Sequence, residues 1–278
     1  MSQAEVKTAI TISLVPQARG GPFVFWDDLK AGCQVASQLG YDAVEIFAPS
    51  AKAVEPKEVG GIVDSLGLQV AALGTGAGWV LHGLSLSDAD NTRRQHAVVF
   101  VREMMDAAAA LNAPAIIGSM QGKATSRNDI PDAVQRLQDS LEVLLEHADA
   151  IDQVLLIEPL NRYETNLINT IDDGRMLCRQ LGADHLRLLA DLFHMNIEET
   201  DLADGIVAGQ SVIGHIHFVD SNRRFPGAGH IPYAPVVSAI RQISFDGYLS
   251  IEGLPWPSSD GAAAEAIRFI REIFAESP

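Results

Sequence analysis

Short apolar runs alternate with longer segments of helical periodicity along the whole chain. A short apolar run bounded by turn residues is typical of a buried strand, and apolar residues spaced three and four apart are typical of an amphipathic helix. The apolar runs predict strands at residues 9–15, 43–47, 69–74, 115–118, 154–157, 186–191, 213–219 and 248–252. Helical segments are predicted between them, at residues 27–39, 56–66, 90–111 and 130–150, from residue 170 and at residues 262–275, and a glycine-rich loop at residues 74–83.

The alternation of strands with helical segments predicts a parallel sheet, and the count of eight strands predicts its closure into an α/β barrel, the (β/α)8 TIM barrel. The chain has 278 residues, of which 47% are hydrophobic, so one large core and a single domain over residues 1–278 are expected. An open doubly wound sheet is the second possibility, but no G-x-G-x-x-G follows an early strand to support it.

Ligand-type side chains stand at the ends of the last four predicted strands. Glu158 is followed by Pro159, which cannot donate to a sheet ladder, and Asp191, His217 and Glu252 lie at or near the ends of the next three strands. Strands in a sheet lie about 4.8 Å apart, so these ends can converge on one small volume. Three carboxylates there would repel one another unless a divalent cation compensated them. Oxygen and nitrogen donors without a thiolate suit Mn²⁺, Mg²⁺, Co²⁺ or Zn²⁺, and the pattern therefore predicts a metal site.

Each of these residues also has a structural interpretation. A single carboxylate at a strand end commonly caps the next helix. His215 lies two residues before His217, on the same side of the strand but deeper, and is interpreted as a core histidine. Glu45, Trp79 and His82 also fall on the predicted active face, but structural roles suit them equally well, so they are not included among the predicted site residues.

Composition limits the classes of partner. Acidic residues number 36 against 20 basic ones, and the net charge of -16 argues against nucleic acid as a partner. No apolar run approaches the length of a membrane span, and the N-terminal region carries Glu5 but no basic-then-apolar signal, so a cytoplasmic protein is expected. Cys33 and Cys178 are far apart in predicted helices and are interpreted as packing residues in a reducing compartment.

The second half of the chain resembles a known family. The matching stretches are Glu-Pro-Leu-Asn-Arg-Tyr-Glu at residues 158–164, Asp-Leu-Phe-His-Met-Asn-Ile-Glu-Glu at 191–199, Gly-His-Ile-His at 214–217, Asn-Arg at 222–223 followed by Pro-Gly-Ala-Gly at 226–229, and Ile-Glu at 251–252. They resemble the xylose-isomerase-like TIM barrels and, within these, the ketose 3-epimerases of the D-tagatose and D-psicose type. The first half resembles the family only in its general βα pattern.

The resemblance implies a role for each matching residue. It implies that Glu158, Asp191, His217 and Glu252 bind a divalent metal, most often Mn²⁺, and that Glu158 and Glu252 are the catalytic acid/base pair. Glu164, His194 and Arg223 match residues that hold substrate oxygens. The resemblance also implies a homodimer or homotetramer.

Some stretches depart from the family or have a plainer interpretation. Many ketose epimerases carry a tryptophan in the loop after the fourth strand, where this chain has Ser-Met-Gln-Gly at residues 119–122, and this leaves the substrate open. Arg223 could instead be a surface arginine beside Arg224. Gly227 and Gly229 indicate either a loop that closes over a ligand or an ordinary turn.

The leading hypothesis is a divalent-metal-dependent sugar epimerase that inverts the carbon next to a ketone through an enediolate, with two glutamates as acid and base. No phosphate-binding loop is evident, so a free sugar or sugar acid is the expected small-molecule partner. An aldose-ketose isomerase of the hydroxypyruvate-isomerase type would use the same groups. A metal-dependent endonuclease acting on abasic DNA would share the barrel, and a non-catalytic sugar-binding barrel would bind a sugar without turning it over.

Overall fold

The computed structural model describes residues 6–182 and 184–276, so Glu5 and the two ends of the predicted domain lie outside the described residues. All described strands are parallel, and the sheet closes because β1 pairs with β3 on one side and with β9 on the other. The strands are β1 (Lys7–Ser13), β2 (Phe25–Trp26), β3 (Ala43–Phe47), β4 (Gln69–Gly74), β5 (Ala115–Ile117), β6 (Leu155–Ile157), β7 (Leu186–Asp191), β8 (Ile213–His217) and β9 (Tyr248–Ile251).

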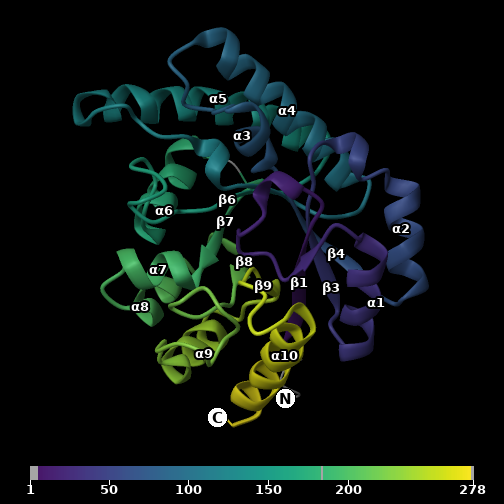
Figure 1. The fold of residues 1–278 in the computed structure, drawn as a ribbon. Helices are drawn as coiled ribbons and strands as arrows, with labels where there is room; N and C mark the ends of the chain where they lie inside the picture. The colour runs from purple at the N-terminus through teal and green to yellow at the C-terminus, as the bar shows by residue number, and fades with distance from the viewer. Residues whose placement is uncertain (1–5, 183, 277–278) are drawn as a thin grey trace.

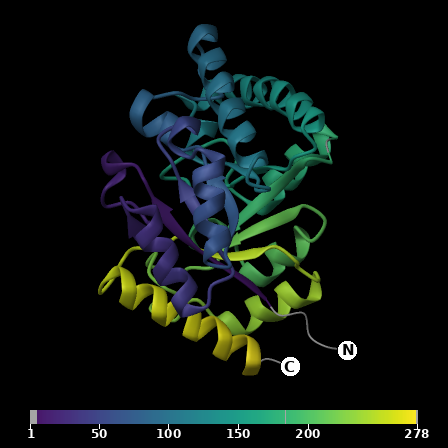
Figure 2. The same ribbon diagram turned by 90° about the vertical axis from the view of Figure 1, so that its right-hand side faces the viewer.

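Helices surround this barrel on its outer face (Figure 1), and α10 lies beside α1 where the ring of helices closes (Figure 2). The predicted (β/α)8 TIM barrel is thereby confirmed. The α-helices are α1 (Leu29–Leu39), α2 (Pro56–Ser65), α3 (Ala77–His82), α4 (Asn91–Ala109), α5 (Ile130–Ala150), α6 (Ile171–Leu181), α7 (Leu192–Glu198), α8 (Leu202–Ala208), α9 (Tyr233–Gln242) and α10 (Ser259–Glu276). Short 3₁₀ helices are η1 (Pro16–Ala18), η2 (Ala51–Ala53), η3 (Ser119–Gln121) and η4 (Arg127–Asp129).

The structure differs from the sequence prediction at two places in the first half. The two-residue strand β2 was not predicted, because it is too short to show a pattern; it pairs with β1 at Ile12 and Ser13, beyond the residues that pair with β9. The prediction of a loop throughout residues 74–83 is wrong, because α3 forms there. A side chain at Gly78 would lie within 3 Å of Met120, so glycine serves close packing here rather than a turn.

The main core lies between the barrel and its helices, and it includes both cysteines. Cys33 and Cys178 are buried and free, as the packing interpretation predicted. Burial raises the pKa of the Cys33 thiol to about 12 and that of Cys178 to about 11, which makes both thiols poor nucleophiles. Across the described ranges, no helix combines the length and apolar character needed to cross a membrane.

Candidate metal centre at the carboxyl ends of the strands

The alternation of side chains along the strands separates an apolar layer from a polar one inside the barrel. Side chains two residues apart in a strand point to the same side of the sheet. The side chain of Glu158 therefore points to the same side as that of Leu156, and the side chain of Asp191 to the same side as that of Leu189. The two leucines belong to a small buried apolar cluster, whereas the two carboxylates stand one layer nearer to the carboxyl ends of the strands. The alternation that directs apolar side chains into the barrel interior therefore also directs the acidic side chains toward its carboxyl-terminal end.

The structure brings together all four residues predicted to bind a metal. One ligand atom from each of Glu158, Asp191, His217 and Glu252 lies within 4.8 Å of the others. Nδ1 of His217 is 3.4 Å from Oδ2 of Asp191 and 3.6 Å from a carboxylate oxygen of both Glu158 and Glu252. Glu158, Asp191 and His217 are buried, and the Glu252 side chain is 14% exposed.

Asp191 both caps a helix and belongs to the acidic cluster, the two roles that its position at a strand end allowed. Its Oδ1 accepts hydrogen bonds from the backbone N–H groups of Phe193 at 2.7 Å and His194 at 3.4 Å, and so caps α7. Its Oδ2 faces His217. The cap holds the carboxylate in one orientation, with one oxygen for the helix and one for the cluster.

These residues fit a divalent cation. Oε1 of Glu158 is buried and has no hydrogen-bond partner in the described part of the chain, although Nε2 of His194 and Nδ1 of His217 lie 3.7 and 3.6 Å away. A buried carboxylate oxygen without a partner is costly, and a cation among these donors would compensate it. Carboxylate oxygen and imidazole nitrogen are donors that Mn²⁺, Mg²⁺, Co²⁺ and Zn²⁺ accept.

The electrostatics of the cluster support the same conclusion. Burial raises the pKa of the Glu252 carboxyl to about 8, although the nearby side chains of His217 and Arg223 act to lower it, and the charges of Glu158 and Asp191 add to the increase. Burial also acts to raise the pKa of Asp191, but His194, His217 and Arg223 outweigh it and hold that pKa below its usual range. Three carboxylates in this volume do not all ionise readily unless additional positive charge is present.

The loop after β5 positions Glu158. A Cβ added to Gly118 would lie 2.6 Å from Oε2 of Glu158, so the glycine leaves the space that the carboxylate fills. The side-chain amide of Gln121 donates a hydrogen bond of 2.9 Å to the backbone oxygen of Glu158. In the sequence this loop stood out only for its missing tryptophan, and neither contact was predicted.

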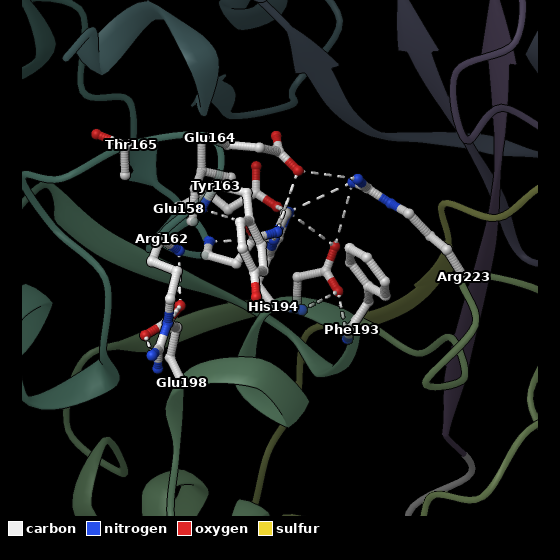
Figure 3. A network of polar contacts seen from close by, with 12 residues as sticks. Glu158, Arg162, Tyr163, Glu164, Thr165, Phe193, His194, Glu198 and Arg223 are labelled. Carbon is white, nitrogen blue, oxygen red and sulfur yellow. Dashed lines mark hydrogen bonds and ion pairs between the residues drawn. The ribbon is translucent and has the colours of Figure 1, made fainter.

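His194 directs a donor into the same space, as Figure 3 shows. Its Nδ1 accepts a hydrogen bond of 3.2 Å from the backbone N–H of Asn161. A backbone N–H can only donate, so in the neutral ring the proton is on Nε2. Nε2 lies 3.7 Å from Oε1 of Glu158 and 3.7 Å from Oδ2 of Asp191. The predicted substrate-binding residue thus adjoins the acidic cluster.

Arg223 reaches the cluster from the loop after β8 (Figure 3). Its guanidinium donates a hydrogen bond of 2.7 Å to Oε2 of Glu252, lies 3.4 Å from Oε1 of Glu164 and stands 4.8 Å from the centre of the Phe193 ring. The interpretation of Arg223 as a surface residue is wrong, because its side chain is only 18% exposed. Burial acts to lower the pKa of Arg223, but the surrounding carboxylates outweigh it and raise that pKa, so the group stays charged.

The backbone holds Arg223 in a conformation that side chains rarely adopt. Its φ is 58°, in the left-handed region that favours glycine. The N–H of Arg223 donates to the backbone oxygen of Asp220 at 2.8 Å, and its own oxygen accepts from Leu254 at 2.7 Å. Strain of this kind is typical of functional sites, where the surrounding structure has to maintain it.

Asp220 also organises the glycine-containing loop that follows. Its carboxylate accepts a hydrogen bond from the N–H of Gly227 at 2.8 Å, and a Cβ at Gly229 would collide with one of its oxygens. The two glycines therefore form a turn around a buried carboxylate. Closure of this loop over a ligand stays a prediction.

The cluster opens into a cavity of about 380 Å³. Phe23, Phe47 and Trp79 line it from the first half of the barrel, and Glu45 lies at its base beside His217. Trp79 and Glu45 fall on the predicted active face but were not included among the predicted site residues; both are in the cavity wall. His82 packs instead against Phe100, with ring centres 6.3 Å apart.

Comparison with known proteins supports the family assignment. The family model described as "Xylose isomerase-like TIM barrel" matches residues 33–273. A D-psicose 3-epimerase from Enterocloster bolteae is 34% identical over 149 residues, which cover 54% of this chain but only 49% of that protein. A 3-dehydro-D-guloside 4-epimerase from Escherichia coli K12 is 28% identical over 225 residues, which cover 78% of this chain and 83% of that protein.

A solved structure agrees in fold. The D-allulose 3-epimerase from Methylomonas sp. superposes with a TM-score of 0.81 at 21% identity, covering 96% of this chain and 98% of that chain. The family model spans most of the barrel, including the four strands that carry the acidic cluster. The chain therefore belongs to the xylose isomerase-like TIM barrel family.

Proposed function

We propose that this chain is a divalent-metal-dependent sugar epimerase that inverts the carbon next to a ketone. Sugar epimerases are the class of enzyme that its relatives represent. The observation that carries the proposal is the convergence of Glu158 and Glu252, with Asp191 and His217, in one buried cluster at the base of a cavity. The two glutamates directly follow β6 and β9, with β7 and β8 between these strands in the barrel.

Glu158, Asp191, His217 and Glu252 would hold the ion. We propose Mn²⁺, and Mg²⁺, Co²⁺ or Zn²⁺ would also suit these donors. When bound, the ion supplies Lewis acidity toward the carbonyl oxygen of the substrate.

The two glutamates perform the proton transfers in this proposal. One removes the proton from the carbon next to the ketone, and the other returns a proton to the opposite face of the planar enediolate. Epimerisation requires two such groups on different sides, because a single base would return the proton to the face it came from. Each general acid–base step contributes a factor of about 10² to 10⁴ in rate.

Neighbouring side chains would hold the oxygens of the substrate. The Nε2–H of His194 can donate to a substrate oxygen beside Glu158, and Arg223 supplies a fixed positive charge where negative charge develops. Glu164 accepts from Arg223 and is partly exposed at the cavity, so it can also accept from a substrate hydroxyl.

The named reactions of the relatives share one chemical feature. A 3-epimerase of a 2-ketose and a 4-epimerase of a 3-dehydro sugar both invert the carbon beside a carbonyl. We therefore propose a free ketose or a keto sugar acid as substrate, bound in the cavity between the acidic cluster and the aromatic wall. We also propose a cytoplasmic homodimer or homotetramer with no nucleic-acid or membrane partner.

The test is incubation of the Mn²⁺-loaded protein with D-psicose, D-fructose, D-tagatose and 3-dehydro sugars, with the products resolved by chromatography. An epimer should form, and in D₂O it should carry deuterium at the inverted carbon. An aldose product would instead identify an aldose-ketose isomerase. Binding without deuterium exchange would identify a sugar-binding barrel, and nicking of abasic DNA would identify a nuclease.

A further inference from the structure

Glu45 and His215 are buried ionisable residues that the proposed reaction does not use. Glu45 belongs to β3, whereas His215 and His217 belong to β8, and they meet across the inside of the barrel. Nε2 of His215 is 2.9 Å from the Glu45 carboxylate, and Nε2 of His217 is 3.2 Å from both of its oxygens. Both imidazoles therefore direct the same nitrogen at one carboxylate.

Irregularities in strand pairing occur beside this cluster. The register of β3 with β4 shifts between Val44 and Glu45, and that of β7 with β8 shifts so that Leu189 pairs with His215. An extra residue of this kind changes the direction of the side chains that follow it. The extra residues are Ala71 of β4 and Gly214 of β8, so the second shift lies directly before His215.

Hydrogen-bond chemistry assigns the protons in this cluster. An ionised carboxylate can only accept, so each imidazole donates from Nε2 to Glu45. Nδ1 of His217, on the opposite side of the ring, faces Glu158, Asp191 and Glu252.

We infer that Glu45 is a positioning residue, which holds His217 with its proton on Nε2 and leaves the lone pair of Nδ1 for the metal ion. This rests on the proposed function. A neutral imidazole carries one N–H, so fixing it on Nε2 leaves Nδ1 as the only nitrogen able to bind a cation. A carboxylate hydrogen-bonded to the far nitrogen of a metal-binding histidine orients the ring and makes it a stronger ligand.

A second ion among Glu45, His215 and His217 is the competing explanation, because their ligand atoms also lie close together. Both carboxylate oxygens of Glu45, however, are already within hydrogen-bond distance of imidazole nitrogens. The neighbouring cluster instead contains a buried oxygen of Glu158 that lacks a hydrogen-bond partner among the described residues. The geometry therefore assigns one ion to the Glu158 cluster and none to Glu45.

The first test compares two matched variants by calorimetric titration with Mn²⁺. In Glu45→Gln the amide removes the negative charge and leaves one accepting oxygen in place of two, so the hydrogen bonds from the two imidazoles weaken and the Kd for Mn²⁺ should rise about 10- to 100-fold. In His215→Gln the same interior layer is changed but an N–H donor toward Glu45 is kept, and the Kd should stay within about threefold of the original value. An unchanged Kd in Glu45→Gln would overturn the inference.

The second test measures the wild-type protein and uses a variant only to assign its NMR signal. In the Zn²⁺-loaded protein labelled with ¹⁵N-histidine, NMR should show His217 protonated at Nε2 and ligated at Nδ1, with one ion bound per chain; the spectrum of His217→Gln assigns the signal. Ligation through Nε2, or two ions per chain, would overturn the inference but leave the proposed function in place. A wild-type chain that binds no divalent ion would instead overturn the proposed function.

Discussion

Replacing Gly118 with alanine tests how closely the backbone approaches Glu158. The new Cβ would lie 2.6 Å from Oε2 of Glu158, whereas ordinary contact begins at 3.4 Å. The carboxylate, at the end of its side chain, is the group that can yield, so it should move by about 0.8 Å, the difference between these two distances. Because Glu158 is both a proposed metal ligand and a proposed acid/base group, this displacement should impair binding and chemistry together.

The expected loss follows from the size of the displacement. A misplacement of about 1 Å can reduce the rate of an enzyme about 10²-fold. This corresponds to about 2.7 kcal/mol in the activation barrier. We expect kcat of Gly118→Ala to fall about 10- to 100-fold and its Mn²⁺ affinity to decrease as well, while the barrel stays folded.

The assay is epimerisation of the best ketose substrate, with metal affinity and circular dichroism measured in parallel. Gly61→Ala is the matched control, because Gly61 lies inside α2 and, among the residues that the structure describes, nothing outside the adjoining helix backbone is within 4 Å of its added Cβ. That variant should keep wild-type kcat and gain up to about 1 kcal/mol in free energy of unfolding, since alanine favours helix. Wild-type kcat and Mn²⁺ affinity in Gly118→Ala would refute the reasoning.

Three further predictions concern the cluster itself. Glu158→Gln and Glu252→Gln should each lower kcat by a factor of about 10² to 10⁴ without unfolding the protein, because the amide cannot exchange a proton; full turnover by either variant would exclude that residue as acid or base. Treatment with EDTA should abolish activity, and Mn²⁺ at 100 times its Kd should add about 2.7 kcal/mol to the free energy of unfolding measured by denaturant titration. Activity that persists after exhaustive chelation would contradict the metal proposal. Arg223→Lys should reduce kcat/KM about tenfold, since an ammonium cannot reach Glu164 and Glu252 together; kinetics equal to wild type would show that the guanidinium geometry is unimportant.

Much of the architecture could be predicted from local pattern. Apolar runs and helical periodicity predicted all the strands that form the barrel, and Pro159 marked the end of the strand before Glu158. Because side chains alternate along a strand, the position of a carboxylate at the end of an apolar run already indicated that it faces the mouth of the barrel. This explains why Glu158, Asp191 and Glu252 could be selected from the sequence.

Other features depend on contacts that no local pattern contains. Glu45, like Glu158, is a carboxylate that belongs to or adjoins an apolar strand, but its partners lie 170 and 172 residues away and meet it across the inside of the barrel. Arg223 was equally compatible with a surface position until the fold placed it over Phe193 and beside Glu252. The short strand β2 pairs with β1, and the helix α3 packs closely against Met120, so both involve contacts with distant parts of the chain.

The sequence by itself determined which elements form, in what order, and which side chains stand at the strand ends, because periodicity and chain direction are local properties. Only the tertiary structure decided which of those side chains meet, because closure of the barrel brings Glu45 of β3 to His215 and His217 of β8 across its interior. The orientation of His217 is the clearest case: the same imidazole could present either nitrogen to the cluster, and the carboxylate of Glu45 from β3 selects Nδ1.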